Sequence, residues 1–248
     1  MLKKTRRTSP REPAEETRKA ILRAAIAEFS AHGLAGARTD AIAESAKVNK
    51  ALLYYYFKSK NDLYLAAIDE VAGIVVERTL AAFHPKHSAG ERLLRMALGH
   101  FDRILTQREF QSLMQQEMVR MRSGESEAMP LLVRKLFGPM LKKLQETVKE
   151  GMRSGELCEM DWLQVVYAML GANVFYFLSA PMMRQSLPFD PMSDAAIAMR
   201  RTALVKYLGK ALFVNRVRGT KLAKRVLAAT PIPNGKKFKS GESTYERA

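Results

Sequence analysis

Apolar residues recur at helical spacing along most of the chain. Near the N-terminus four of them mark one helix face at positions i, i+3, i+4 and i+7: Leu22, Ala25, Ile26 and Phe29. Gly33 is the expected end of that helix. Similar patterns predict helices at 39–46, 50–57, 60–83, 88–105, 106–122, 127–153, 161–178 and 193–214. Because no stretch alternates apolar and polar residues as a half-buried strand does, the pattern predicts an all-α protein.

Caps and helix breakers refine these limits. Ser59 and Asp62 have the spacing of a capping box at the start of helix 60–83, and Asp161 and Ser193 precede two later helices. Gly138-Pro139 is expected to kink helix 127–153, because proline lacks the backbone donor. Residues 181–191 begin and end with proline and are expected to form a loop.

The two shortest helices, 39–46 and 50–57, are separated by a tight turn. Thr39 is expected to cap the first, because its hydroxyl can accept a hydrogen bond from a free backbone N–H. Asn49 is expected to cap the second, which begins at Lys50. Leu53 and Phe57 then share the apolar face of the second helix. This spacing predicts a helix-turn-helix pair.

Three consecutive tyrosines, Tyr54, Tyr55 and Tyr56, occupy the second short helix. Successive helical residues point ~100° apart, so three of them sweep ~200°. That arc is wider than the apolar stripe of a surface helix, and at least one tyrosine must therefore face outward. One interpretation is a half-buried aromatic helix whose hydroxyls reach water. The other is a recognition helix that presents Lys, Leu and Tyr side chains to the major groove of DNA.

The stretch 38–63 resembles the DNA-binding motif of the tetracycline-repressor (TetR) family of bacterial transcription regulators. The residues that carry the resemblance are Thr39, Ile42, Ala43, Val48, Leu53, Tyr54, Tyr56, Phe57, Lys60, Asp62 and Leu63. Two positions depart from the family pattern: Lys47 stands where the family usually has the turn glycine, and Leu52 follows the small residue after Lys50. The resemblance implies an N-terminal three-helix DNA-binding domain, followed by a larger helical ligand-binding and dimerisation domain.

The resemblance and the exposed positions of the second helix together predict the DNA contacts. The candidate residues are Thr39, Lys47, Asn49, Lys50, Leu52, Tyr54, Tyr55, Tyr56 and Lys60. Thr39 and Lys60 are assigned to phosphates, because the N-terminus of a helix attracts anions and the matching lysine of the family touches the DNA backbone.

The charge of the chain is concentrated at its two ends. The formal net charge of +16 divides into +6 for residues 1–58, +3 for 59–214 and +7 for 215–248. Such basic ends favour a polyanionic partner. We expect a flexible basic arm at 1–13, the helix-turn-helix domain at 14–58 and the ligand-binding domain at 59–214. Residues 215–248 are predicted to be a disordered solubilising tail, or alternatively an extra non-specific DNA contact.

Several classes of protein are disfavoured. Cys158 is the only cysteine, so a disulfide within the chain and a cysteine-based zinc site are excluded, and a reducing cytoplasm fits. The four histidines lack metal-binding spacing, and no nucleophile or phosphate-loop motif occurs, so neither an enzyme nor a cofactor is expected. The apolar stretch 162–180 is interrupted by Gln164 and Asn173, and is interpreted as a helix buried in a dimer, not as a membrane span.

The predicted ligand-binding domain is rich in methionine and aromatic residues at helical spacing. For any one of them core packing is the favoured interpretation, but the resemblance implies an inducer pocket, and flexible methionines suit an apolar ligand. The candidate pocket residues are Met96, Phe101, Leu105, Met114, Met118, Met121, Phe137, Met140, Tyr167, Asn173, Tyr176 and Phe177.

Two apolar stripes on the last predicted helices suggest a dimer interface. Their members are Val166, Leu170, Val174, Ile197, Leu204, Val205, Leu208 and Leu212. Gly171 and Gly209 are expected to allow close approach of helices there. In the resembled family the corresponding helices form a four-helix bundle with those of a second copy.

These features predict a homodimeric repressor that is released from a near-palindromic double-stranded operator by a small apolar molecule. It would act in the cytoplasm, on the nucleoid when DNA-bound. The alternatives are a protein that coats DNA without reading its sequence, and an α-helical carrier or enzyme for apolar molecules.

Overall fold

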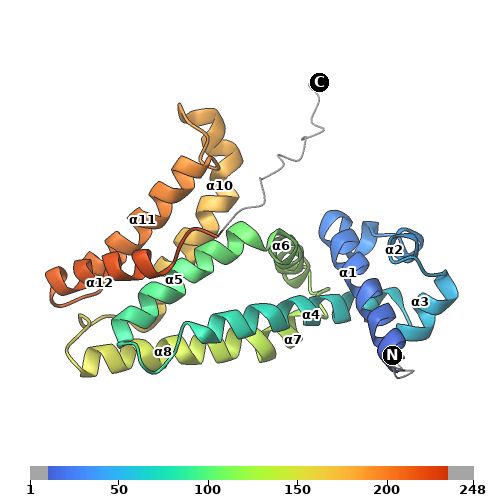
Figure 1. The fold of residues 1–248 in the computed structure, drawn as a ribbon, viewed down its shortest axis with the longest axis horizontal. Coiled ribbons are helices and arrows are strands. Elements are labelled where there is room, and N and C mark those ends of the chain that lie inside the picture. The colour runs from blue at the N-terminus through green and yellow to red at the C-terminus, as the bar shows by residue number, and fades with distance from the viewer. Residues whose placement is uncertain (1–10, 234–248) are drawn as a thin grey trace, which may run out of the picture. The chain divides into compact units, whose positions relative to one another are not determined.

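Every regular element of the chain is a helix in the computed structural model, which describes residues 11–233 (Figure 1). Beside the helices, the described residues contain one isolated antiparallel bridge, between Leu157 and Phe213. The prediction of an all-α chain is confirmed. The elements form two units that are interleaved along the chain. One runs to Phe83 and adds Gln107–Leu144, and the other contains His84–Thr106 and the chain from Gln145 onward.

The first unit is built around its N-terminal helix. Its elements are α1 Arg11–Gly36, α2 Thr39–Ser45, α3 Lys50–Tyr56, α4 Lys60–Ala81, α6 Arg108–Arg122, α7 Met129–Leu132, the π-helical turn η1 Val133–Phe137 and the start of α8 Gly138–Arg153. Helix α1 packs against α2, α4 and α6. Its apolar stripe is buried, and the Phe29 ring meets the Tyr64 ring edge-on at 5.0 Å. Gly33 has the left-handed φ of 69° expected where the regular helix ends.

A buried polar network joins α4 to α6 inside this unit. The Tyr64 hydroxyl donates to Oε1 of Glu117 at 2.6 Å, and the Arg120 guanidinium donates to the same oxygen at 2.9 Å. Ser126 donates to the other carboxylate oxygen. Glu117 is fully buried, so these three donors replace the water that its charge has lost. Burial raises the pKa of the Tyr64 phenol, and the hydrogen bond to Glu117 raises it further.

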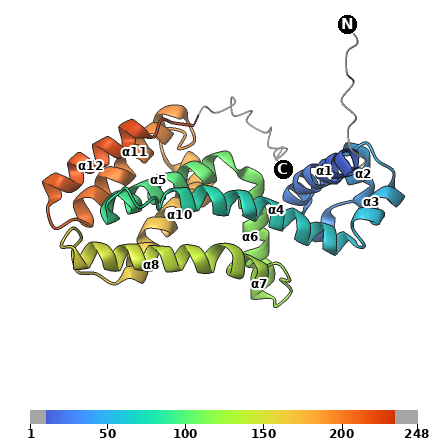
Figure 2. The same ribbon diagram turned by 60° about the horizontal axis from the view of Figure 1, so that its bottom comes forward.

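The second unit is organised around α5, Ala89–Thr106. Its other elements are the end of α8, α9 Trp162–Val166, the π-helical turn η2 Tyr167–Gly171, α10 Ala172–Ser186, α11 Asp194–Ala211 and α12 Arg216–Ala229. Helices α10, α11 and α12 all contact α5, and Figure 2 shows α11 and α12 side by side along it. Leu93, Met96 and Phe101 are completely buried at this centre. The amphipathic spacing of α5 therefore supplies the core of the unit.

A buried ion pair links α5 to α11. Nε of Arg201 donates to Oδ1 of Asp102 at 2.7 Å, and an amino group of Arg201 donates to Oδ2 at 2.8 Å. The side chains are only 4% and 11% exposed, so the paired charges replace each other's hydration. The same amino group reaches the backbone oxygens of Thr230 and Pro231, just beyond α12.

The prediction of a disordered tail from residue 215 is wrong as far as residue 229. Asn215 caps α12 by accepting from the N–H of Arg218, and Leu222, Ala223 and Val226 are buried. A Cβ on Gly219 would lie 2.0 Å from the backbone oxygen of Gly209, so the two glycines let α11 and α12 come very close. The backbones of α11 and α12 touch at these glycines, so α12 packs against α11 with few large apolar side chains. Residues 1–10 of the predicted arm, and the tail beyond 233, lie outside the described residues.

Two predicted breaks in helices also need correction. Pro181 lies inside α10, which continues to Ser186, so the predicted loop 181–191 begins only at Leu187. A single proline removes one backbone hydrogen bond, and here that loss does not end the helix. Near Gly138-Pro139 the irregularity is a π-helical turn over Val133–Phe137, in which the N–H of Gly138 donates to the oxygen of Val133.

The run Trp162–Ser186 is long and apolar enough to cross a membrane, and a window of 18 residues within it has a mean hydropathy of 1.4. A third of that window is buried within the protomer. Length and composition alone do not distinguish a membrane span from a helix that packs against protein.

Candidate nucleic-acid interface

Helix α2 begins differently from the sequence prediction. Thr39 is its first helical residue, and the N-cap position belongs to Arg38, whose side chain makes no capping bond. The N–H of Arg38 donates to Oε1 of Glu28 on α1 at 2.9 Å. The Thr39 hydroxyl instead accepts from the Tyr54 hydroxyl of α3, at 3.4 Å. The prediction of Thr39 as the cap is therefore wrong, and its side chain contacts the second helix of the pair.

The turn between α2 and α3 has an unusual backbone. Lys47 has a φ of 57°, and it is the one residue other than glycine with a positive φ among those described. Hydrogen bonds from the N–H groups of Lys47 and Val48 to Glu44 and Ala43 close the turn. Oδ1 of Asn49 then accepts from the N–H of Leu52 at 2.7 Å, which confirms Asn49 as the cap of α3.

Lys47→Gly is expected to increase the free energy of unfolding by about 1 kcal/mol. A left-handed conformation costs an L-residue roughly 1–2 kcal/mol, and the greater chain freedom of glycine offsets part of the gain. Urea denaturation would measure the change. Glu44→Gly, in the regular part of α2, is the matched control and should lose about 1 kcal/mol. Equal losses in both variants would mean that Lys47 carries no backbone strain.

Helix α3 presents one face to the core and another to solvent. Leu53 and Phe57 are buried, as their shared spacing predicted. Tyr55 is 80% exposed and Tyr54 37% exposed, whereas Tyr56 packs against the core of the unit. The prediction that at least one tyrosine faces outward is confirmed, and Tyr55 is the most exposed of the three.

Two of the candidate lysines are held by oxygen atoms of the protein. Nζ of Lys50, on α3, lies 2.9 Å from the Asp40 carboxylate of α2, and the hydrogen bond between them raises the pKa of Lys50. Both side chains are more than half exposed. Nζ of Lys60, at the start of α4, donates to the backbone oxygen of Ala35 at 3.1 Å. Both ammonium groups are thereby oriented at the surface of the first unit.

The turn and the exposed side of α3 carry the outward-facing polar groups. Lys47, Asn49, Lys50 and Tyr55 are exposed, and Leu52 is half-buried beside them. Ammonium and hydroxyl groups can donate to phosphates or base edges. An α-helix with its side chains is about 10–12 Å across, which fits the major groove of B-DNA, about 12 Å wide.

The predicted pocket residues do not all come together. In the second unit the Phe101 ring contacts the rings of Phe177 at 4.9 Å and Tyr176 at 5.7 Å. Met96 and Leu105 are buried on the same helix as Phe101, and Asn173 is buried with its Nδ2 donating to the oxygen of Ala97 at 2.9 Å. These six residues belong to the second unit.

The remaining candidates behave differently. Met114 and Met140 are buried, and Phe137 packs against the core of the first unit. Met118, Met121 and Tyr167 are each more than half exposed. The buried face of α6 contains Phe110, Leu113 and Met114, so positions 118 and 121 fall on the solvent side. The prediction that these three exposed residues line an enclosed pocket is therefore wrong.

The predicted dimer stripe of α11 is also misplaced. Ile197, Leu204, Val205, Leu208 and Leu212 are buried in their own protomer, where α11 packs against α5 and α12. Val166 is buried as well, Leu170 is half-buried and Val174 is 40% exposed. Gly209 approaches α12 of the same chain, and Gly171 has open space around it.

Sequence reasoning identified only Val174 among the residues that do form an exposed apolar face. They lie on the outer sides of α10 and α11 and are Val174, Phe175, Leu178, Met182, Met199 and Tyr207. Their spacings of about four and eight residues were readable, but the competing stripe on the other side of α11 was stronger. Among the described residues no cluster of His, Cys, Asp and Glu is suited to a metal ion.

Comparison with known proteins agrees with this architecture. The family described as "Bacterial regulatory proteins, tetR family" matches residues 21–67, which contain the α2–turn–α3 pair. The description "Tetracyclin repressor-like, C-terminal domain" matches residues 90–207. The two matches together span more than half of the chain.

Individual relatives match over different lengths, and the chain spans about a third of the length of the first two curated relatives. The HTH-type transcriptional repressor SCO4008 of Streptomyces coelicolor is 45% identical over 56 residues, which are 23% of this chain and 29% of that protein. The HTH-type transcriptional regulator RutR of Escherichia coli is 29% identical over 170 residues, 66% of this chain and 75% of RutR. The crystal structure of the transcriptional regulator SCO4942 from Streptomyces coelicolor aligns with a TM-score of 0.61 at 25% identity, over 79% of this chain and 98% of that one. The chain belongs to the TetR family of bacterial regulatory proteins.

Proposed function

We propose that the protein is a transcriptional repressor that binds a near-palindromic operator as a homodimer and is released by a small apolar molecule. The observation that carries the proposal is the exposed surface of the turn and α3. Lys47 is exposed in the turn, and Lys50 and Tyr55 are exposed on a helix whose other face is buried. Two such helices read two half-sites about one helical turn apart, ~34–36 Å, when a two-fold axis relates them. Work in the cytoplasm, where DNA is accessible, fits a chain with a single cysteine.

The exposed apolar face of α10 and α11 supports the homodimer. Phe175, Leu178 and Met199 are each about 60% exposed. The two helices touch through Arg200, whose guanidinium lies 5.4 Å from the centre of the Tyr176 ring and donates to the oxygen of Ala172. Large apolar side chains gathered on one face indicate a protein partner, and a second copy buries the same face of both subunits.

The effector site is assigned to the aromatic cluster of the second unit. Phe101, Tyr176 and Phe177 supply apolar contacts, and Oδ1 of the fully buried Asn173 has no hydrogen-bond partner. Its Nδ2 lies 3.3 Å from Nδ1 of His100, and burial lowers the pKa of His100 to about 3, so that the ring is neutral. A buried acceptor without a donor is costly, and a ligand with one hydroxyl or N–H group would satisfy it.

Footprinting on genomic DNA tests the proposal. The wild type should protect a near-palindrome at moderate salt. Lys50→Ala combined with Tyr55→Ala should weaken this binding about a hundredfold, since each lost base contact costs about 1–3 kcal/mol. Its melting temperature should stay nearly constant, because both side chains are exposed.

Arg184→Ala, on the exposed surface of α10, is the control in this experiment. A protein that coats DNA without reading its sequence would protect no defined palindrome. For an α-helical carrier of apolar molecules, replacing Lys50 and Tyr55 would not change DNA protection. Either of these two footprinting results would contradict the proposal of a repressor.

A further inference from the structure

A basic stretch that begins in α11 and runs through α12 contains no acidic residue of its own. Residues 195–233 contain nine Lys and Arg residues and no Asp or Glu. Three of them, Arg201, Arg218 and Arg225, form ion pairs with carboxylates of other elements. The others depend on solvent or on a partner for their counter-charge.

Among the described residues, four cations with no carboxylate within ion-pair distance gather at the end of α11 and along α12. Lys210, Arg216, Lys221 and Lys224 line a cavity of about 530 Å³ together with Val217 and Thr220. No carboxylate belongs to this lining, and all four side chains belong to exposed residues. We call these four residues the α12 surface. Like charges held side by side repel one another, so the surface favours an anion.

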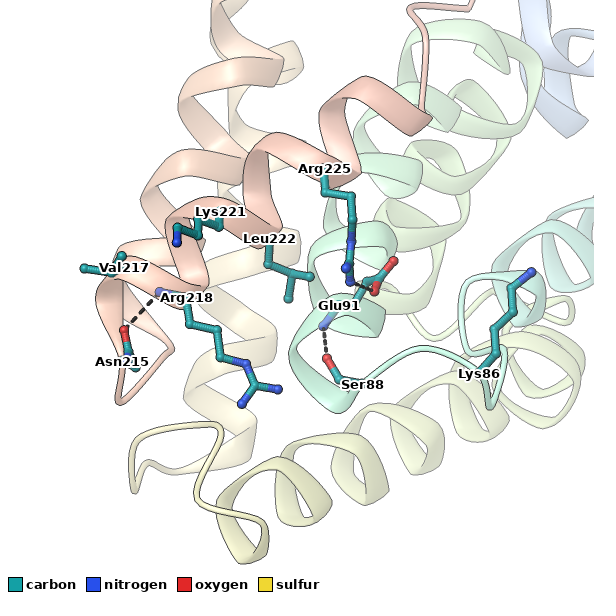
Figure 3. A pocket seen from close by; sticks show the side chains of 9 residues that line it. All are labelled: Lys86, Ser88, Glu91, Asn215, Val217, Arg218, Lys221, Leu222 and Arg225. Atoms are coloured by element: carbon teal, nitrogen blue, oxygen red, sulfur yellow. Dashed lines mark hydrogen bonds and ion pairs between the residues drawn. The ribbon is translucent and has the colours of Figure 1, made fainter.

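The opposite side of α12 has a second cavity, of about 690 Å³, which shares Val217 and Lys221 with the first. Figure 3 shows Arg218 and Arg225 extending from α12 toward Ser88 and Glu91 at the start of α5. Glu91 is buried and pairs with Arg225, so this side is partly neutralised. The α12 surface itself keeps its full charge.

We propose that the α12 surface binds the phosphate backbone of DNA without reading its sequence, as a contact separate from the α2–α3 pair. Three of the cations, Arg216, Lys221 and Lys224, extend over about 12 Å of α12, and Lys210 of α11 lines the same cavity. Each DNA strand carries a phosphate about every 3.4 Å of axis, so a line of this length meets several phosphates at once. The positive line thus matches a polymer in length as well as in charge.

The apolar side of α12 argues against a membrane as the anionic partner. Helices that lie on membranes expose a wide apolar face beside their cations. In α12 the apolar residues Leu222, Ala223 and Val226 are buried against the protein, and Val217 is the one large apolar side chain of this helix that is exposed. A single exposed valine is not the wide apolar face that a membrane-bound helix inserts, whereas the four cations are exposed to a phosphate-bearing partner.

Salt titration of the full-length protein tests this contact. The probe is a short duplex of random sequence that lacks any operator, with salt varied between about 50 and 200 mM. In the triple variant Lys210→Gln, Lys221→Gln and Lys224→Gln, the slope of log affinity against log salt should become shallower by about 2–3, since each phosphate contact contributes about 0.9. Protection of the operator palindrome should persist.

A triple variant with the same loss of charge elsewhere is the control. Arg134→Gln, Lys142→Gln and Lys149→Gln removes three exposed cations on η1 and α8, and it should leave the slope unchanged. Equal slopes for the wild type and the α12 variant would overturn the proposal. The proposal would also be overturned if the protein bound vesicles of anionic lipid but did not bind the duplex. Loss of operator protection in the Lys50 and Tyr55 variant tests the repressor separately, so the two proposals can fail independently.

Discussion

Asp102→Asn is expected to lower the free energy of unfolding of the second unit by about 3–5 kcal/mol. The substitution keeps the shape of the side chain but leaves the Arg201 guanidinium, which is 4% exposed, without its opposite charge. The two strong hydrogen bonds at 2.7 and 2.8 Å become weaker bonds to a neutral amide. Urea denaturation followed by circular dichroism would measure the loss.

A control variant and a double variant test whether this loss comes from the unpaired Arg201 charge. Glu159→Gln removes an exposed carboxylate from the same unit and should change stability by less than about 0.5 kcal/mol. Asp102→Leu combined with Arg201→Met should recover most of the loss, because replacing both buried charges by apolar groups is often neutral. If Asp102→Asn were as stable as the wild type, the Arg201 charge would have to be hydrated in the folded protein.

Gly219→Val is expected to destabilise the second unit by about 3 kcal/mol, the upper end of the cost of overpacking. A Cβ on Gly219 would lie 2.0 Å from the backbone oxygen of Gly209 and 2.7 Å from the Phe213 ring. Backbone atoms cannot move aside as flexible side chains can, so α12 must shift away from α11. The melting temperature and urea midpoint should both fall.

Gly73→Ala is the matched control for this substitution. Gly73 lies in α4, is exposed, and an added Cβ there would meet nothing within 4 Å. Alanine should stabilise that helix by about 0.5–1 kcal/mol. If Gly219→Val were equally harmless, the close crossing of α11 and α12 would not be a tight contact in solution.

The sequence predicted features that depend on neighbours within four residues. Ser59, Asn49, Asp161 and Ser193 each accept the expected backbone hydrogen bond at the start of a helix. These contacts form between a side chain and the next turn, so local spacing is sufficient to find them. The burial of Leu53 and Phe57 follows in the same way from helical period.

Features that depend on contacts between distant segments could not be predicted from the sequence. The apolar stripe of α11 was assigned to a second copy because α12, its real partner, has few large apolar residues and a strongly basic composition. Gly209 and Gly219 meet through backbone atoms, and glycines add no apolar side chains at helical spacing that would indicate the contact in the sequence. Thr39 was mistaken for a cap because Glu28, ten residues before Arg38, takes the N–H that begins α2.

The candidate DNA surface was predicted from a resemblance and from the tyrosine run. The ion pair on this surface was not predicted, because Lys50 and Asp40 are ten positions apart and lie on different helices. The left-handed φ of Lys47 was equally hidden, although the family's glycine at that position indicated where to look.

The interleaving of the two units has a consequence for synthesis and for gene architecture. The chain completes neither unit in one pass, because Gln107–Leu144 returns to the first after His84–Thr106 has entered the second. During translation α1 therefore meets its packing partner α6, which begins at Arg108, only 48 residues after α4 begins at Lys60. A gene fusion that joins this head to another body at Phe83 would leave α1 without α6, one of its packing partners.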